Sequence, residues 1–120
     1  TYWADGLIIS TPTGSTGYSL SSGGPIMSPL TAGFVLTPIA PHNLNIRPLI
    51  IPNSTLIELE VTGRGKDHLL SLDSRIISLD QGTRILVKKA PFTLATIELH
   101  DNAFFKTLRD KLFWGLDTRN

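Results

Sequence analysis

Short runs of β-forming residues, separated by Pro, Gly, Asn and Asp, are the feature that most restricts how this chain can fold. Val, Ile, Leu and Thr recur in runs of five to eight residues, as in a protein built of short strands. Residues 56–61 nearly alternate between apolar and polar, which suits an antiparallel strand with one buried face. We expect strands at residues 6–10, 46–51, 55–62, 68–73, 75–79, 83–89 and 92–99, with hairpin turns at 63–66 and 80–82.

The C-terminal tail breaks this pattern and predicts a helix. Phe104, Phe105, Leu108, Leu112 and Phe113 fall on one helical face, which Asp101 or Asn102 could cap. This apolar face needs a partner, which is either the chain's own sheet or a further domain. The predicted fold class is therefore mainly β, a sandwich or distorted barrel with a peripheral C-terminal helix.

Length and composition bound the function. The 120 residues, of which 41% are hydrophobic, are enough for one core, so we expect a single domain. A net charge of +1 from scattered charges offers no basic surface for nucleic acid or an anionic membrane. Cysteine is absent, which removes disulfides, thiolate metal sites and a Cys nucleophile. No apolar run approaches the roughly 18 residues of a membrane span. We expect a cytoplasmic protein, and the start at Thr1 predicts a piece of a longer chain.

Residues 10–22 are the segment most suited to binding. They read Ser-Thr-Pro-Thr-Gly-Ser-Thr-Gly-Tyr-Ser-Leu-Ser-Ser, in which eight of thirteen positions are Ser or Thr. Glycines allow close approach to a ligand, and hydroxyls hydrogen-bond ribose, amide and phosphate groups without adding charge. A helix starting near Thr16 would add free N–H groups. Composition alone, however, favours a solvent-exposed turn with no binding role.

Several familiar sites are absent from the sequence. The glycines are not followed by the Gly-Lys-Ser/Thr of a Walker loop, and neither a Gly-x-Gly-x-x-Gly nor a Gly-x-Ser-x-Gly motif occurs. The three histidines, His42, His68 and His100, are far apart. We therefore predict neither a catalytic triad nor a metal cluster.

The residues as a whole resemble a known family. Residues 5–26, from Asp-Gly-Leu-Ile-Ile-Ser-Thr-Pro-Thr-Gly-Ser-Thr-Gly-Tyr to Gly-Gly-Pro-Ile, closely resemble the long motif of the NAD kinases. A second family stretch is similar to residues 37–42 with 47–49. The family's Asp-Gly-Gln or Asp-Ser-Gln turn resembles residues 72–75, and its closing helix resembles residues 104–115. The resemblance spans essentially the whole chain.

This resemblance implies a fold, a reaction and partners. The fold would be the two-sheet, distorted β-sandwich of the NAD kinase C-terminal domain, with an N-terminal α/β domain and its catalytic Asp absent. The whole enzyme would transfer the γ-phosphoryl group of ATP, or of polyphosphate, to the 2′-hydroxyl of the NAD adenosine ribose, with Mg²⁺ or another divalent cation bridging the phosphates. The chain itself would hold no catalytic or metal-binding residue and would be inactive alone. A homodimer or homotetramer is also implied.

The same resemblance implies an NAD site. Thr16 and Ser21 would lie near the adenine end, and the Tyr18 ring would pack along the dinucleotide. Asp5 would accept a hydrogen bond from the nicotinamide carboxamide. Without the neighbouring motif, an Asp in this position would favour a capping or turn carboxylate at a strand edge. Ala40 would reach the nicotinamide end of a ligand held by a neighbouring subunit. The complete set of implied NAD-binding residues is Asp5, Thr16, Gly17, Tyr18, Ser19, Leu20, Ser21, Ala40 and Arg75.

Three residues depart from the family pattern. Gly17 stands where many members have Ala, and Arg75 where Gln is common. Arg75 either contacts a phosphate or pairs with Asp73 on the surface. Trp3 stands where a cation is frequent, so it either packs on the core or stacks on an aromatic group. The alternative function is a non-enzymatic nucleotide-binding or assembly module, and a lipid kinase of the related superfamily comes third.

Overall fold

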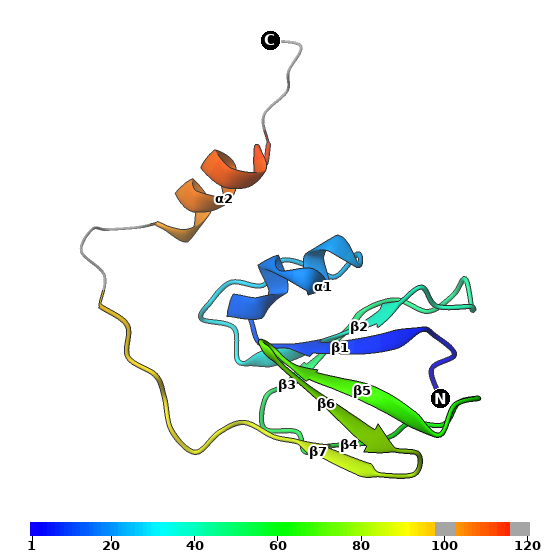
Figure 1. The fold of residues 1–120 in the computed structure, drawn as a ribbon. Helices are drawn as coiled ribbons and strands as arrows, with labels where there is room; N and C mark the ends of the chain where they lie inside the picture. The colour runs from blue at the N-terminus through cyan, green and yellow to red at the C-terminus, as the bar shows by residue number, and fades with distance from the viewer. Residues whose placement is uncertain (98–102, 116–120) are drawn as a thin grey trace. The chain divides into compact units, whose positions relative to one another are not determined.

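The structure, a computed structural model, describes residues 1–97 and 103–115 (Figure 1). Contacts divide the chain into two compact units. Unit 1 comprises Thr1–Pro52 and Pro91–Asn120, and unit 2 comprises Asn53–Ala90.

Unit 1 contains a three-stranded antiparallel sheet in the order β1-β2-β3. Its strands are β1 (Gly6–Ser10), β2 (Gly33–Ile39) and β3 (Leu49–Pro52). The register places Gly6 opposite Ile39 and Phe34 opposite Ile51. The bounds of β1 match the prediction, and β3 begins three residues later than expected. The central strand β2 was not predicted, because its seven residues include Pro38, which lacks a backbone N–H and argues against a central strand.

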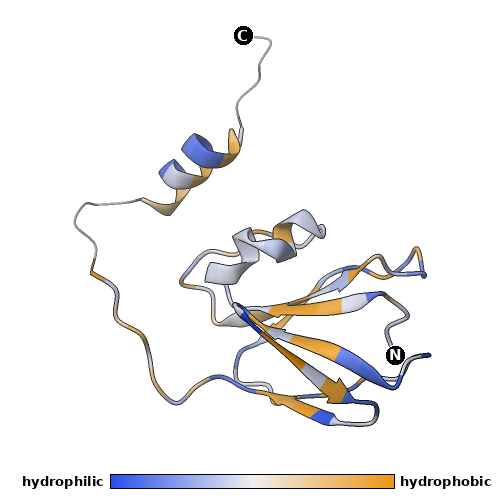
Figure 2. Cartoon of the chain, viewed as in Figure 1, coloured by the Kyte–Doolittle hydropathy of each residue, from blue (hydrophilic) through white to orange (hydrophobic). Residues whose placement is uncertain are grey.

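The core of unit 1 lies on the central strand. Phe34, Val35 and Leu36 of β2 are buried, together with Met27 and Leu108. Figure 2 shows apolar residues concentrated on the strands, whereas the short helices after β1 carry residues near the middle of the hydropathy scale. These are the 3₁₀ helix η1 (Thr13–Thr16) and the single turn α1 (Tyr18–Ser21), which packs against β1.

The predicted C-terminal helix is present as α2 (Phe104–Leu112). Ala103 occupies its N-cap position without a side-chain hydrogen bond, and the two proposed caps, Asp101 and Asn102, lie outside the described residues. Leu108 is buried, but Phe105 remains 65% exposed. Phe113 follows the helix in a left-handed conformation, with φ 54°, so it does not continue the helical face. Within residues 1–97 and 103–115, no helix has the length and apolarity to cross a membrane.

Unit 2 consists of two antiparallel strand pairs, one nested within the other in sequence. Strand β4 (Ile57–Glu60) pairs with β7 (Arg84–Val87), and β5 (Asp67–Leu72) pairs with β6 (Arg75–Asp80). The β5–β6 hairpin turns at Asp73, whose φ is 51°. Residues 92–97, expected to be part of a strand, form none.

The two predicted hairpin turns are wrong, because each connects strands that do not pair with each other. Glycine-rich turn residues show where the chain reverses, but not which strand it then pairs with. Instead, the two connections bind each other. The Gln81 side chain donates to the carbonyl oxygens of Gly63, at 2.8 Å, and Gly65, and accepts from the Gly63 N–H at 3.3 Å. The predicted fold class is nevertheless confirmed as mainly antiparallel β with a C-terminal helix.

Candidate functional site

Three buried hydroxyls hold the Gly/Ser/Thr segment in place within unit 1. Ser15 Oγ donates to the Pro12 carbonyl at 2.6 Å and accepts from the Met27 N–H at 3.0 Å. Ser19 Oγ and Thr37 Oγ1 are hydrogen-bonded at 2.8 Å, which joins α1 to β2. All three side chains are at most 1% exposed. We call Ser15, Ser19 and Thr37 the hydroxyl clasp.

Gly24 completes the clasp because no larger residue fits there. A Cβ at this position would lie 2.3 Å from Ser19 Oγ and 2.7 Å from Thr37 Oγ1. The Gly24 N–H also donates to the Ser19 carbonyl at 2.7 Å. The segment is therefore not an unconstrained solvent loop, because its buried hydroxyls are hydrogen-bonded to the backbone and to strand β2.

The outer side of this segment presents most of the predicted NAD-binding residues. Thr16, Gly17, Tyr18 and Ser21 are exposed, Tyr18 by 64%, and Leu20 is half-buried. Ser19 lies beneath them, with its hydroxyl already bonded to Thr37. The hydroxyls of Thr16 and Ser21 bond weakly to backbone carbonyls of their own turns, at 3.5 and 3.0 Å.

The expected free N–H groups are not found at two key positions. The Gly17 N–H donates to the Gly14 carbonyl, and the Leu20 N–H donates to the Gly17 carbonyl, both at 3.0 Å. Moreover, α1 is only four residues long, too short to develop an appreciable helix dipole. The N–H groups of Gly17 and Leu20 are therefore not available to a ligand, whereas the exposed hydroxyls of Thr16 and Ser21 and the Tyr18 ring are accessible.

A second group of site residues gathers where the β1–β2 ladder ends. The Asp5 N–H donates to the Ile39 carbonyl at 2.9 Å, so Asp5 lies beside Ala40. Ala40 has a φ of 44°, a left-handed conformation that turns the chain sharply after β2. His42 Nε2 then lies 3.6 Å from Asp5 Oδ1, with both side chains about two-thirds exposed. Sequence reasoning did not include His42 in the site, because only the strand register brings it to Asp5.

The two groups lie at different points along unit 1. Asp5, Ala40 and His42 mark the start of β1, whereas η1 and α1 follow its end. The first and last Cα atoms of the five-residue strand β1 are four steps of about 3.3 Å apart, which is roughly 13 Å. The site residues are therefore spread out as an extended ligand would require.

Arg75 belongs to unit 2 rather than to either group. It is exposed at the start of β6, opposite Leu72. It forms no ion pair with Asp73 among the described residues. Nor does any group of three His, Asp or Glu side chains in the described ranges form a potential metal site.

Comparison with known proteins identifies the family. Residues 1–99 match the model of the ATP-NAD kinase C-terminal domain. The chain belongs to this family. It is 62% identical over 119 residues to an NAD kinase of Christiangramia forsetii and 60% identical to one of Flavobacterium psychrophilum, in each case over 99% of this chain. It spans 40% of the length of these two relatives.

Solved NAD kinase structures agree with this assignment. Yeast NADH kinase complexed with NADH is 32% identical, with a TM-score of 0.82 over 95% of this chain and 36% of that one. An NAD kinase from Archaeoglobus fulgidus in complex with ATP is also 32% identical, with a TM-score of 0.64 over 74% of this chain and 34% of that one. This chain therefore has the NAD kinase C-terminal domain fold.

Proposed function

We propose that the protein containing this chain is an NAD kinase and that this domain binds the dinucleotide. The reaction would transfer the γ-phosphoryl group of ATP, or of polyphosphate, to the 2′-hydroxyl of the adenosine ribose to form NADP. The family match carries this proposal, since it includes the whole of the Gly/Ser/Thr segment. Relatives described as complexed with NADH and with ATP support the two substrates.

The residues of this chain would contribute by binding and orienting the acceptor. The Asp5 carboxylate accepts hydrogen bonds only, and the carboxamide NH₂ of nicotinamide is a donor, so the two are complementary. The exposed Tyr18 ring would pack along the dinucleotide, and the hydroxyls of Thr16 and Ser21 would lie near its adenine. The hydroxyl clasp holds the backbone that carries these groups, which assigns Ser19 a positioning role. Phosphoryl transfer depends mainly on positioning and electrostatic stabilisation, so binding is a direct contribution to the rate.

The proposed enzyme also needs groups that this chain does not supply. The catalytic Asp would belong to an N-terminal α/β domain. The described residues offer no ligand set for Mg²⁺, and we therefore derive no step through a metal. A homodimer or homotetramer, in which Ala40 approaches a ligand of the neighbouring subunit, remains a prediction, as do the contact of Arg75 with NAD and the cytoplasmic location. No observation favours a non-enzymatic module.

The proposal is tested by steady-state kinetics of the full-length protein with NAD and ATP. Losing a hydrogen bond to a charged group costs about 1.5–3 kcal/mol, so Asp5→Ala should raise the KM for NAD by about tenfold or more. Tyr18→Ala should also weaken NAD use, whereas Asp80→Ala, an exposed carboxylate of unit 2, should not. If both site variants keep wild-type NAD kinetics, the site assignment is wrong. If the wild-type protein forms no NADP, the proposed function itself is wrong.

A further inference from the structure

A shallow, open hollow lies beside the Asp5–His42 pair. Its volume is about 540 Å³, and it is lined by Trp3, His42, Asn43, Leu44 and Asn45. His42 belongs both to the hollow and to the pair, in which its Nε2 lies 3.6 Å from Asp5 Oδ1. A group held by the Asp5 carboxylate is therefore brought to the rim of this hollow.

The walls of the hollow are held by hydrogen bonds in which at least one partner is a backbone group. The His42 N–H donates to the Trp3 carbonyl at 2.8 Å, which extends the β1–β2 pairing and fixes Trp3 beside the loop. Within the loop, the Asn45 N–H donates to Asn43 Oδ1 at 2.9 Å. Arg47 Nη1 donates to the carbonyls of Leu44, at 2.6 Å, and Ile46, at 2.9 Å. The loop is therefore built to keep one conformation.

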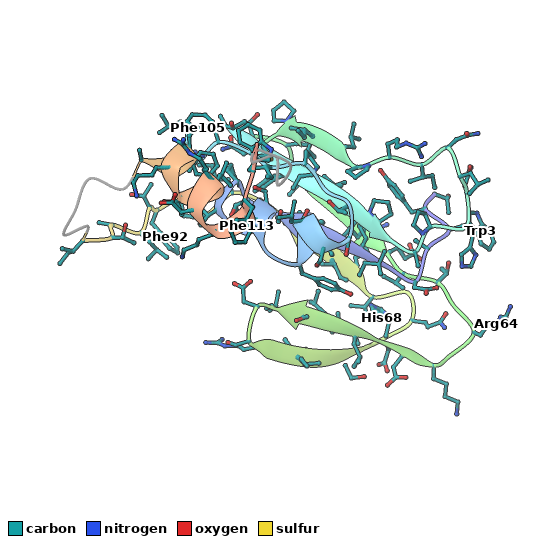
Figure 3. The ribbon with its side chains drawn as sticks, turned by 90° about the horizontal axis from the view of Figure 1, so that it is seen from above. Trp3, Arg64, His68, Phe92, Phe105 and Phe113 are labelled. Carbon is teal, nitrogen blue, oxygen red and sulfur yellow. The ribbon has the colours of Figure 1, made fainter. Side chains whose placement is uncertain are left out.

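This loop and Trp3 nevertheless leave large apolar side chains in solvent. Trp3 is 70% exposed and Leu44 is 87% exposed. Figure 3 shows Trp3 at the outer edge of unit 1. Of the two sequence-based alternatives for Trp3, packing on the core is therefore wrong, and stacking on an aromatic group remains. An indole face next to amide side chains suits a flat aromatic ring that carries a polar substituent.

We propose that Trp3 is a ligand-binding residue that stacks on the nicotinamide ring of the dinucleotide. This inference rests on the proposed function and deepens it. The carboxamide, bound by Asp5, fixes one edge of the ring. The ring itself then covers the indole, and both flat surfaces leave water. Trp3 thereby contributes to the choice of a nicotinamide dinucleotide over nucleotides that lack this ring.

The test compares two ligands that differ only at this end. The full-length protein is titrated calorimetrically with NAD and with ADP-ribose, which has the same adenosine diphosphate and ribose but no nicotinamide. Aromatic stacking is worth about 0.5–1.5 kcal/mol, so Trp3→Ala should weaken NAD binding about twofold to twelvefold and leave ADP-ribose binding unchanged. Trp3→Phe, which keeps an aromatic face, should stay within about twofold of the wild type for NAD. The matched control is Leu30→Ala, which truncates a side chain that is 95% exposed in another turn.

Each other outcome overturns the inference. If Trp3→Ala binds NAD as the wild type does, no stacking occurs. If it loses NAD and ADP-ribose equally, Trp3 supports the fold and not the ring. If sedimentation velocity shows that Trp3→Ala separates associated subunits while each chain keeps its NAD affinity, the hollow is a contact between copies. A wild-type protein that binds neither ligand overturns the proposed function, and the inference with it, whereas normal wild-type binding with an unaffected variant overturns the inference alone.

Discussion

Replacing Gly24 with alanine is expected to release the Gly/Ser/Thr segment from the sheet beneath it. The new Cβ would lie 2.3 Å from Ser19 Oγ, 2.7 Å from Thr37 Oγ1 and 2.8 Å from the Ser19 carbonyl oxygen. Side chains do not approach one another this closely. One atom, the carbonyl oxygen, belongs to the backbone that accepts the Gly24 N–H bond. The segment must therefore shift, and the Ser19–Thr37 hydrogen bond must lengthen or break.

Two costs determine the size of the effect. Overpacking a buried position costs about 1–3 kcal/mol. Leaving a buried hydroxyl without its partner costs about 1–3 kcal/mol. Together they predict a local destabilisation of about 2–6 kcal/mol, a large part of the roughly 5–15 kcal/mol that stabilises a typical domain. Gly63→Ala is the matched control, because a Cβ there meets only Gln81 Nε2, at 3.9 Å, and should change stability by less than about 0.5 kcal/mol.

Native-state amide hydrogen exchange of the full-length protein measures the local destabilisation at individual amides. The reporting amides are those of Gly24 and Met27, which donate to Ser19 O and Ser15 Oγ. A cost of about 2–6 kcal/mol predicts exchange at these amides about 30-fold to about 25,000-fold faster in Gly24→Ala. NAD affinity should fall in the same variant, because the exposed residues of the segment lose their support.

A double-mutant cycle can refute this reasoning. Ser19→Ala removes the atom closest to the new Cβ. Adding Gly24→Ala to that background should therefore cost at least about 1 kcal/mol less than in the wild type, because contacting residues are not additive. Equal costs in the two backgrounds, or unchanged exchange at Gly24 and Met27, would show that the clasp does not hold the segment.

Two further predictions concern other parts of the chain. Gln81→Ala should destabilise unit 2 by about 1–2 kcal/mol, since the Gly63 N–H and two carbonyls lose their partner. Faster hydrogen exchange at the Gly63 amide would show this destabilisation. The control Arg64→Ala, in the same connection, should leave that exchange rate unchanged. In α2, the Lys106 ammonium, hydrogen-bonded to Asp110 at 2.8 Å, holds the pKa of that carboxyl below its ordinary value of 3.8. This contribution to stability is present above the unfolded pKa and is lost as the pH falls through the lower folded value. An NMR titration of Asp110 should show the lowered pKa and its return toward 3.8 in Lys106→Gln, whereas the same pKa in both proteins would exclude the contact.

Local patterns predicted the elements of the fold better than their pairing. The five residues of β1 and the helix α2 follow from composition and periodicity alone. By contrast, β2 was missed although it is the central strand. Pro38 lies beyond Gly33–Leu36, the part of β2 that pairs with β3, so its missing N–H does not interrupt that pairing. Both predicted hairpin turns were wrong for a related reason. A turn sequence fixes a reversal of direction, whereas the nested pairing of β4 with β7 depends on contacts between residues distant in sequence.

For the candidate site too, the sequence determined some features and the tertiary structure decided others. The sequence by itself determined the family and the segment that carries it, because residues 5–26 form a long run of specific residue types. Only the tertiary structure decided what each hydroxyl does. Ser15 and Ser19 face inward and Thr16 and Ser21 face outward, because neighbouring residues of a short helix point in different directions. Likewise, His42 meets Asp5, 37 positions away, only because the register of β1 on β2 brings the two ends of the ladder together.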